Sequence, residues 1–239
     1  MNNFSLYLVC FIVPLILGLA VQGWLKSTFA RNSQKAIASG KTGAEVAREI
    51  LDRNGLSSVP VQTSKAGPLS DHYDPRGRTV NLSAPVFGGR SVAATAVAAH
   101  EVGHAIQHAK SYVPMTLRSA FWPVAAFGSQ AWFIILIFGV VMGGLTDISG
   151  GAASPTGRLL VTASLILFAV VVLFQFVTLP VEFNASRRAA KQLREMGLVT
   201  DAEAAGVRQT LTAAAMTYVA GALAALAQLL YFVLRFGGR

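Results

Sequence analysis

Three residues near the middle of this 239-residue sequence have the types and spacing for metal-assisted hydrolysis: His100, Glu101 and His104 of the pentapeptide HEVGH. Helical residues four apart lie about 40° apart around the axis and one turn apart along it, so both imidazoles can reach one ion. Glu101 lies to one side of this pair, where its carboxylate can reach an attacking water without binding the metal. The pattern predicts a single catalytic Zn²⁺ that polarises a scissile carbonyl, with Glu101 as the general base.

A catalytic zinc needs a third protein ligand and one open position. In metzincins the motif continues with a glycine and a third histidine. Gln107 and Lys110 occupy those two positions here, so the metzincin continuation is absent. His108 lies two turns from His100, too far to join the same ion, and we interpret it as a residue at the rim of the site or on a polar face. Glu182 is the better candidate, because it follows an apolar run and begins a polar helix. The alternative is an ordinary carboxylate stabilised by the helix dipole.

Together with His108, three further residues are weaker candidates for contacting substrate or the oxyanion: His72, Tyr73 and Tyr218. That role needs a hydrogen-bond donor near the open coordination position. Residues of these types in a turn are more often packing or hydrogen-bond anchors. The segment 79–83 could pair with an extended peptide if it is an edge strand, and the sequence leaves an internal strand equally open.

Local patterns predict the elements that position these residues. The alanine-rich, proline-free segment 91–109 carries HEVGH and predicts a helix. Thr42 and Glu45 form a capping-box pattern ahead of another helix, AEVAREILDRN. Alternating residues predict strands at 59–63 and 78–83, and the intervening GPLSDHYDPRG is typical of turns.

The polar segment that carries Glu182 has its own helix signals. Pro180 suits the first turn of a helix that ends at Gly197. Thr200 and Glu203 form a second capping-box pattern beyond it.

The composition indicates a membrane protein, because 53% of the residues are hydrophobic and 13% are charged. We expect a mainly α-helical fold of about four transmembrane helices with a small α+β, zincin-like catalytic domain. The last apolar run is the least certain span, since its small residues could instead pack on the catalytic helix. The expected parts are transmembrane helices at 4–25, 121–145, 159–179 and 211–234, a catalytic domain at 26–118, and a third-ligand helix and connector at 180–210.

Charge and cysteine content exclude other classes. The net charge of +9 comes without stacking aromatics or a nucleic-acid-binding motif, so anionic lipid headgroups, not nucleic acid, explain it. A single cysteine, Cys10, excludes an internal disulfide framework and a cysteine-based zinc knuckle. The amino terminus lacks the features of a cleaved signal, and we interpret it as a retained anchor.

The distribution of Lys and Arg predicts the orientation. Basic residues follow the first and third apolar runs, whereas the Gly/Ser/Pro-rich hairpin at 146–157 has none. Both polar segments are therefore expected on the cytoplasmic side of the cell (inner) membrane. Two crossings separate these segments, which also requires them to share one side.

The stretches DHYDPRGRTVNLSAPVFGGRSVAATAVAAHEVGHAIQHA, LPVEFNASRRA and TAAAMTYVA resemble the YugP-like family of bacterial membrane-bound neutral zinc metallopeptidases over nearly the whole chain. The HEVGH helix together with the EFxA pattern, EFNA at 182–185, is similar, more distantly, to HtpX-type proteases and CAAX-prenyl endopeptidases. The resemblance implies a gluzincin site, with zinc on His100, His104 and Glu182 and the base at Glu101. In the wider clan an aspartate four residues after the ligand glutamate steadies a histidine, and Ser186 stands there instead. Asp71 or Asp74 could replace it, or the support could be weaker.

These observations predict a zinc-dependent membrane endopeptidase that acts on polypeptides, including membrane proteins. One alternative is a site-2-like intramembrane protease, although a segment with three histidines and a glutamate is costly to insert into lipid. The other is a metal-binding membrane protein without turnover.

Overall fold

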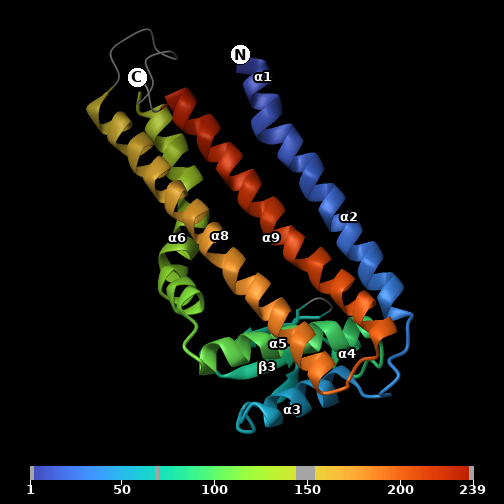
Figure 1. Ribbon diagram of the computed structural model, residues 1–239. Helices are drawn as coiled ribbons and strands as arrows, with labels where there is room; N and C mark the ends of the chain where they lie inside the picture. The colour runs from blue at the N-terminus through green and yellow to red at the C-terminus, as the bar shows by residue number, and fades with distance from the viewer. Residues whose placement is uncertain (1–2, 68–69, 144–153, 237–239) are drawn as a thin grey trace. The chain divides into compact units, whose positions relative to one another are not determined.

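The computed structural model describes residues 3–67, 70–143 and 154–236 (Figure 1). Within these residues, four helices are long and apolar enough to cross a membrane: Phe4–Ser33, Val113–Val141, Pro155–Glu195 and Asp201–Phe236. A small three-stranded sheet accompanies them. The expected fold class, a mainly helical membrane protein with a small α+β region, is confirmed. The expected hairpin at 146–157 lies largely outside the described residues.

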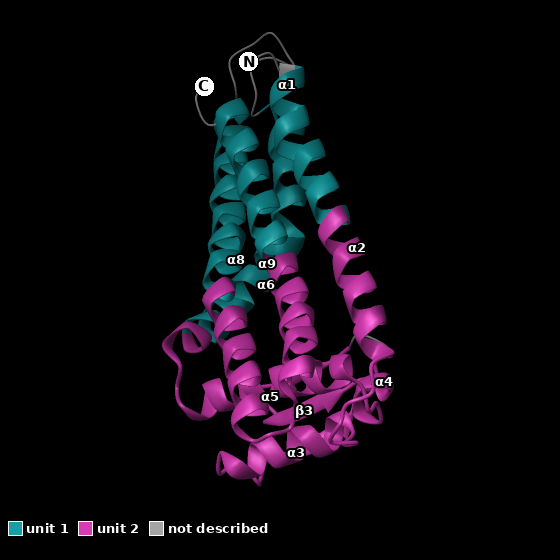
Figure 2. Ribbon diagram, turned by 45° about the vertical axis from the view of Figure 1, so that its right-hand side comes forward, with its two compact units in different colours: residues 1–19, 117–178, 219–239 teal, residues 20–116, 179–218 magenta. Residues whose placement is uncertain are grey.

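The chain divides into two compact units, coloured separately in Figure 2. The first unit comprises residues 1–19, 117–178 and 219–239, and most of its described residues are helical. They belong to α1 (Asn3–Tyr7), the π-helical turn η1 (Leu8–Ile12), α2 (Val13–Ser33), α6 (Val113–Val141), α8 (Pro155–Glu195) and α9 (Asp201–Phe236).

Small and aromatic side chains pack the helices of the first unit together. At Gly139 of α6, a Cβ atom would lie 2.8 Å from the backbone nitrogen of Val161, so the absence of a side chain allows α6 and α8 to touch. Trp132 stacks on Phe168 with ring centroids 4.1 Å apart, and Phe232 of α9 meets both rings edge-on. Many large apolar side chains of this unit are exposed, as expected of a surface that faces lipid.

Two of the long helices are longer than expected. A new helix was expected to begin at Pro180, but α8 runs without interruption from Pro155 to Glu195. An internal proline removes only one backbone hydrogen bond, and helices with strong apolar packing continue through it. Helix α9 also begins earlier than the expected span at 211–234. It starts at Asp201, where Thr200 and Glu203 form the predicted capping box.

The second unit, residues 20–116 and 179–218, contains the sheet. Its strands are β1 (Val61–Thr63), β2 (His72–Asp74) and β3 (Thr79–Leu82), in the order β1-β3-β2. The central strand β3 is parallel to β1, pairing Val80 with Val61, and antiparallel to β2, pairing Val80 with Tyr73. The edge position considered for 79–83 is therefore wrong, and β2 is an edge strand instead. Its residues were expected in a turn, because three residues are too few to show a period.

The helices of the second unit are α3 (Gly43–Arg53), α4 (Ala84–Phe87), α5 (Val92–Ala109) and the adjoining parts of α2, α8 and α9. The Thr42–Glu45 capping box is present at the start of α3. Ser91 caps α5 by accepting a hydrogen bond from the backbone N–H of Ala94. Helix α3 packs along α5 in Figure 1, and both helices contribute to one buried core with β3. This core holds α5 in place.

Candidate metal centre

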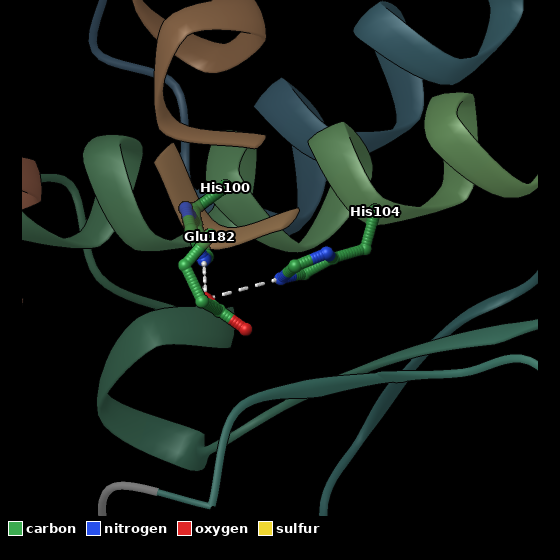
Figure 3. A group of neighbouring side chains, drawn as sticks. All are labelled: His100, His104 and Glu182. Carbon is green, nitrogen blue, oxygen red and sulfur yellow. Dashed lines mark hydrogen bonds and ion pairs between the residues drawn. The ribbon is translucent and has the colours of Figure 1, made fainter. Parts of the chain in front are cut away.

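His100 and His104 of α5 meet Glu182 of α8 in the second unit (Figure 3). The Oε2 atom of Glu182 lies 3.2 Å from Nε2 of His100 and 3.6 Å from Nε2 of His104. Ligand atoms about 2.0–2.2 Å from a tetrahedral zinc lie roughly 3.3–3.5 Å from one another. Two imidazole nitrogens and one carboxylate oxygen are also donors that zinc prefers, so these three residues fit a zinc ion.

Gly103, inside the HEVGH sequence, explains how Glu182 comes so close. A Cβ atom at this position would lie 2.7 Å from the backbone oxygen of Ala185 and 3.1 Å from its Cα atom. No real Cβ atom tolerates such a contact, so α5 and α8 touch backbone to backbone there. Glu182 lies one helical turn before Ala185, which places its carboxylate opposite the two histidines.

The second nitrogen of each histidine has a partner of its own. Nδ1 of His100 lies 3.2 Å from Oγ of Ser186, and Nδ1 of His104 lies 3.0 Å from Oε1 of Gln107. An amide oxygen only accepts, so His104 carries its proton on Nδ1 and presents the lone pair of Nε2 toward Glu182. Hydrogen bonds of this kind orient metal-binding histidines.

Gln107 was not identified as part of the site from the sequence, where it served only to exclude a metzincin. Its position three residues after His104, on the same helix face, is the signal that could have revealed it. Its Nε2 donates to the backbone oxygen of Val181 at 2.8 Å and to Oδ1 of Asn184 at 3.0 Å. One buried amide thus joins a histidine of α5 to the segment of α8 around Glu182.

Asp71 and Asp74 do not take the histidine-supporting role considered for them. Both oxygens of Asp71 accept hydrogen bonds from Ser83, and Oδ1 of Asp74 accepts one from the backbone N–H of Arg76. Ser186, which occupies the place of the clan's aspartate, contacts His100 itself.

Glu101 is buried, with 7% of its surface exposed, and is not a member of the ligand cluster. Its Oε2 atom accepts a hydrogen bond of 3.0 Å from the backbone N–H of Tyr73 in β2. Burial raises the pKa of Glu101 to about 7, against the lowering influence of His100 and with further raising by Glu182 and Asp71. A carboxyl with a pKa near neutrality is suited to accept and return a proton, and a nearby cation would lower this pKa.

The weaker candidates lie in different places. Tyr73 and His108 contact each other through Oη and Nδ1 at 2.8 Å, and Nδ1 of His72 lies 2.8 Å from the backbone oxygen of Ser70. None of these three side chains lines the cavity beside the ligands, whereas Tyr218 does. Burial also raises the pKa of the Tyr73 hydroxyl.

This cavity has a volume of about 340 Å³ and lies entirely within the second unit. Helices α2, α5, α8 and α9 and the segment before β2 contribute its walls. His100, Glu101 and Glu182 are among its lining residues, so a molecule in the cavity would touch the candidate metal centre.

Comparison with known proteins shows the family of the chain. The family described as "Putative neutral zinc metallopeptidase" matches residues 7–237. The chain is 45% identical over 230 residues to a Bacillus subtilis (strain 168) protein named "Putative membrane protease YugP", an alignment that covers 95% of this chain and 96% of that protein. No solved structure matches the chain. On this evidence the chain belongs to the family of neutral zinc metallopeptidases.

Proposed function

We propose that this protein is a zinc-dependent membrane endopeptidase of the gluzincin type, with one catalytic zinc held by His100, His104 and Glu182. The observation that carries the proposal is the convergence of both Nε2 atoms on the Glu182 carboxylate, 3.2 and 3.6 Å away, beside the buried Glu101. A structural zinc is closed by four protein ligands, whereas this cluster offers three and adjoins a cavity.

Zinc, when bound, supplies Lewis-acid polarisation of the substrate carbonyl and lowers the pKa of water. Glu101 takes a proton from the attacking water as the new C–O bond forms at the carbonyl carbon. It returns that proton to the amide nitrogen as the C–N bond breaks, which leaves a carboxylate and an amine. The backbone N–H of Tyr73 holds the Glu101 carboxylate in place for both transfers. Tyr218, which lines the cavity, is the proposed donor to the oxyanion.

We place the reaction at the cytoplasmic surface of the cell membrane, on membrane or membrane-associated polypeptides. The basic residues that follow the first and third apolar runs support this side. The four long apolar helices support attachment to the bilayer.

Substitution of Glu101 by Gln separates catalysis from metal binding. The purified Glu101→Gln protein should keep one zinc per chain, because Glu101 lies outside the ligand cluster. Its rate of cleavage of an unfolded protein such as casein should fall by about 10²–10⁴-fold, the usual contribution of a general base. An unchanged rate would refute the mechanism, and loss of zinc together with activity would make Glu101 a ligand and not a base.

A further inference from the structure

We propose that the cavity beside the metal centre is a pocket for a large apolar side chain next to the scissile bond, so that the substrates are polypeptides with such a residue at one flanking position. The inference rests on the proposed endopeptidase function and adds its substrate class.

The first argument is position. His100, Glu101 and Glu182 line the cavity, so a carbonyl group placed for attack lies at its wall. Consecutive Cα atoms of a peptide are only 3.8 Å apart. One of the two residues that flank the scissile bond is therefore close enough to place its side chain in this cavity.

The second argument is the chemistry of the walls. Apolar atoms form most of the lining surface, contributed by Leu25 and Phe29 of α2, Val97 of α5, and Leu211, Ala214 and Ala215 of α9. Burying apolar surface there is favourable, whereas a charged side chain would lose its hydration against the same atoms. Polar side chains form the smaller part of the lining, among them Lys26 and Asp71, and the carboxylate of Asp71 already accepts hydrogen bonds from Ser83.

The third argument is size. A volume of about 340 Å³ lies at the small end of the roughly 300–1,000 Å³ of ligand sites. It suits one large side chain with its adjoining backbone and excludes a folded domain. The α9 wall includes two small residues, Ala214 and Ala215, so a larger residue at either position would take space from the pocket.

Two variants in α9 fill the pocket, one variant in α9 is their control, and one variant in α2 enlarges the pocket. Ala214→Leu fills the pocket, and Ala214→Val does so by a smaller step that disturbs packing less. Thr212→Leu adds a similar apolar group on the same helix at an exposed position outside the lining. Phe29→Ala, in α2, enlarges the pocket.

The experiment uses the full-length, zinc-loaded protein and peptides that differ only at the two positions flanking one bond, carrying Gly, Ala, Leu, Phe, Lys or Glu. Binding is measured by fluorescence anisotropy on the Glu101→Gln background, and cleavage sites are mapped by mass spectrometry on the active protein. We expect Leu and Phe to be preferred over Gly at one flanking position by about tenfold or more, in binding and in cleavage. Ala214→Leu should reverse this preference toward Ala and Gly, Phe29→Ala should favour Phe, and Thr212→Leu should change nothing.

The outcomes separate the two proposals. Apolar preference in binding without cleavage by the active protein would refute the endopeptidase function and leave the pocket standing. Three outcomes would overturn the pocket. The first is cleavage without apolar preference, and the second is a preference for Lys or Glu. The third is an Ala214→Leu protein that binds zinc and keeps the wild-type preference. If Ala214→Leu fails to bind zinc, Ala214→Val and Phe29→Ala decide by the same criterion.

Discussion

Gln107 shows how much of this site depends on a residue that would not itself touch the metal. Its side chain is fully buried and makes three hydrogen bonds, to His104, to the backbone of Val181 and to Asn184. The oxygen of the amide sets the tautomer of His104, one proposed ligand, and the nitrogen holds the segment of α8 that carries another, Glu182. We interpret Gln107 as a positioning residue for two of the three ligands.

Replacing Gln107 with Leu should raise the zinc dissociation constant by about 10–100-fold, because histidine partners outside the ligand set contribute that much to metal affinity. Competition with a chromogenic chelator measures this constant without any need for turnover. Gln107→Glu keeps an acceptor for His104 and should lose less. Gln192→Leu, on α8, removes the hydrogen bond that Gln192 accepts from Asn54 away from the metal centre and is the matched control. Equal zinc affinity in Gln107→Leu and wild type would contradict the role.

The candidate ligands and the general base could be predicted from the sequence, but the residues that hydrogen-bond to the ligands could not. His100, Glu101 and His104 follow from one helical repeat, and Glu182 follows from its place after an apolar run. The partner of His104 could not be chosen in the same way, because Gln107 gains its meaning only when α8 crosses beside it.

At the scale of elements, the crossing of α5 and α8 at Gly103 brings the proposed ligands His100, His104 and Glu182 together. Backbone contact at this point leaves no space for a side chain, with Ala185 opposite. The crossing also explains why a glycine, which weakens a helix by about 1 kcal/mol relative to alanine, stands inside HEVGH.

Gly103→Ala should therefore separate the two helices and weaken zinc binding. Forcing a methyl group into a closed contact costs about 1–3 kcal/mol of unfolding free energy, despite the better helix propensity of alanine. Thermal unfolding in detergent and zinc titration measure the two effects. Gly23→Ala in α2 is the control, because nothing lies within 4 Å of a Cβ atom there, and it should not lower the unfolding temperature. Wild-type zinc affinity in Gly103→Ala would show that the crossing does not set the site.

The elements that the sequence predicted are those with strong local signals. The helix around HEVGH, the strands near 61 and 80 and both capping boxes were recognised. The strand β2 was missed because its three residues are stabilised by pairing with β3 rather than by their own pattern. The break expected at Pro180 was wrong because packing outweighs the loss of one backbone hydrogen bond.

At the scale of the whole molecule, the second unit is assembled from two stretches, 20–116 and 179–218. The chain between them contains α6 and most of α8, two of the four helices able to cross a membrane. Two crossings return the chain to the side it left, so both parts of the metal centre can form in one compartment. Helix α5, which carries HEVGH, is not among the candidate spans in the described residues.

Cysteine labelling tests this arrangement. In a protein with Cys10 replaced by Ala, single cysteines at Arg53 and Lys191 should react with a membrane-impermeant maleimide only after the cells are opened. A cysteine at the exposed Thr156, in the first turn of α8, should react in intact cells. The reverse pattern would place the metal centre outside the cell, and reaction of positions 53 and 191 from opposite sides would exclude a site built from both stretches.

The central claim is that residues far apart in the sequence share one zinc, and the zinc content of wild type beside Glu182→Ala tests it most directly. After dialysis against a weak chelator, metal analysis should find one zinc per chain in wild type and far less in Glu182→Ala, because two histidines alone do not complete the protein's ligand set. A Glu182→Ala protein that retains one tightly bound zinc would contradict the claim.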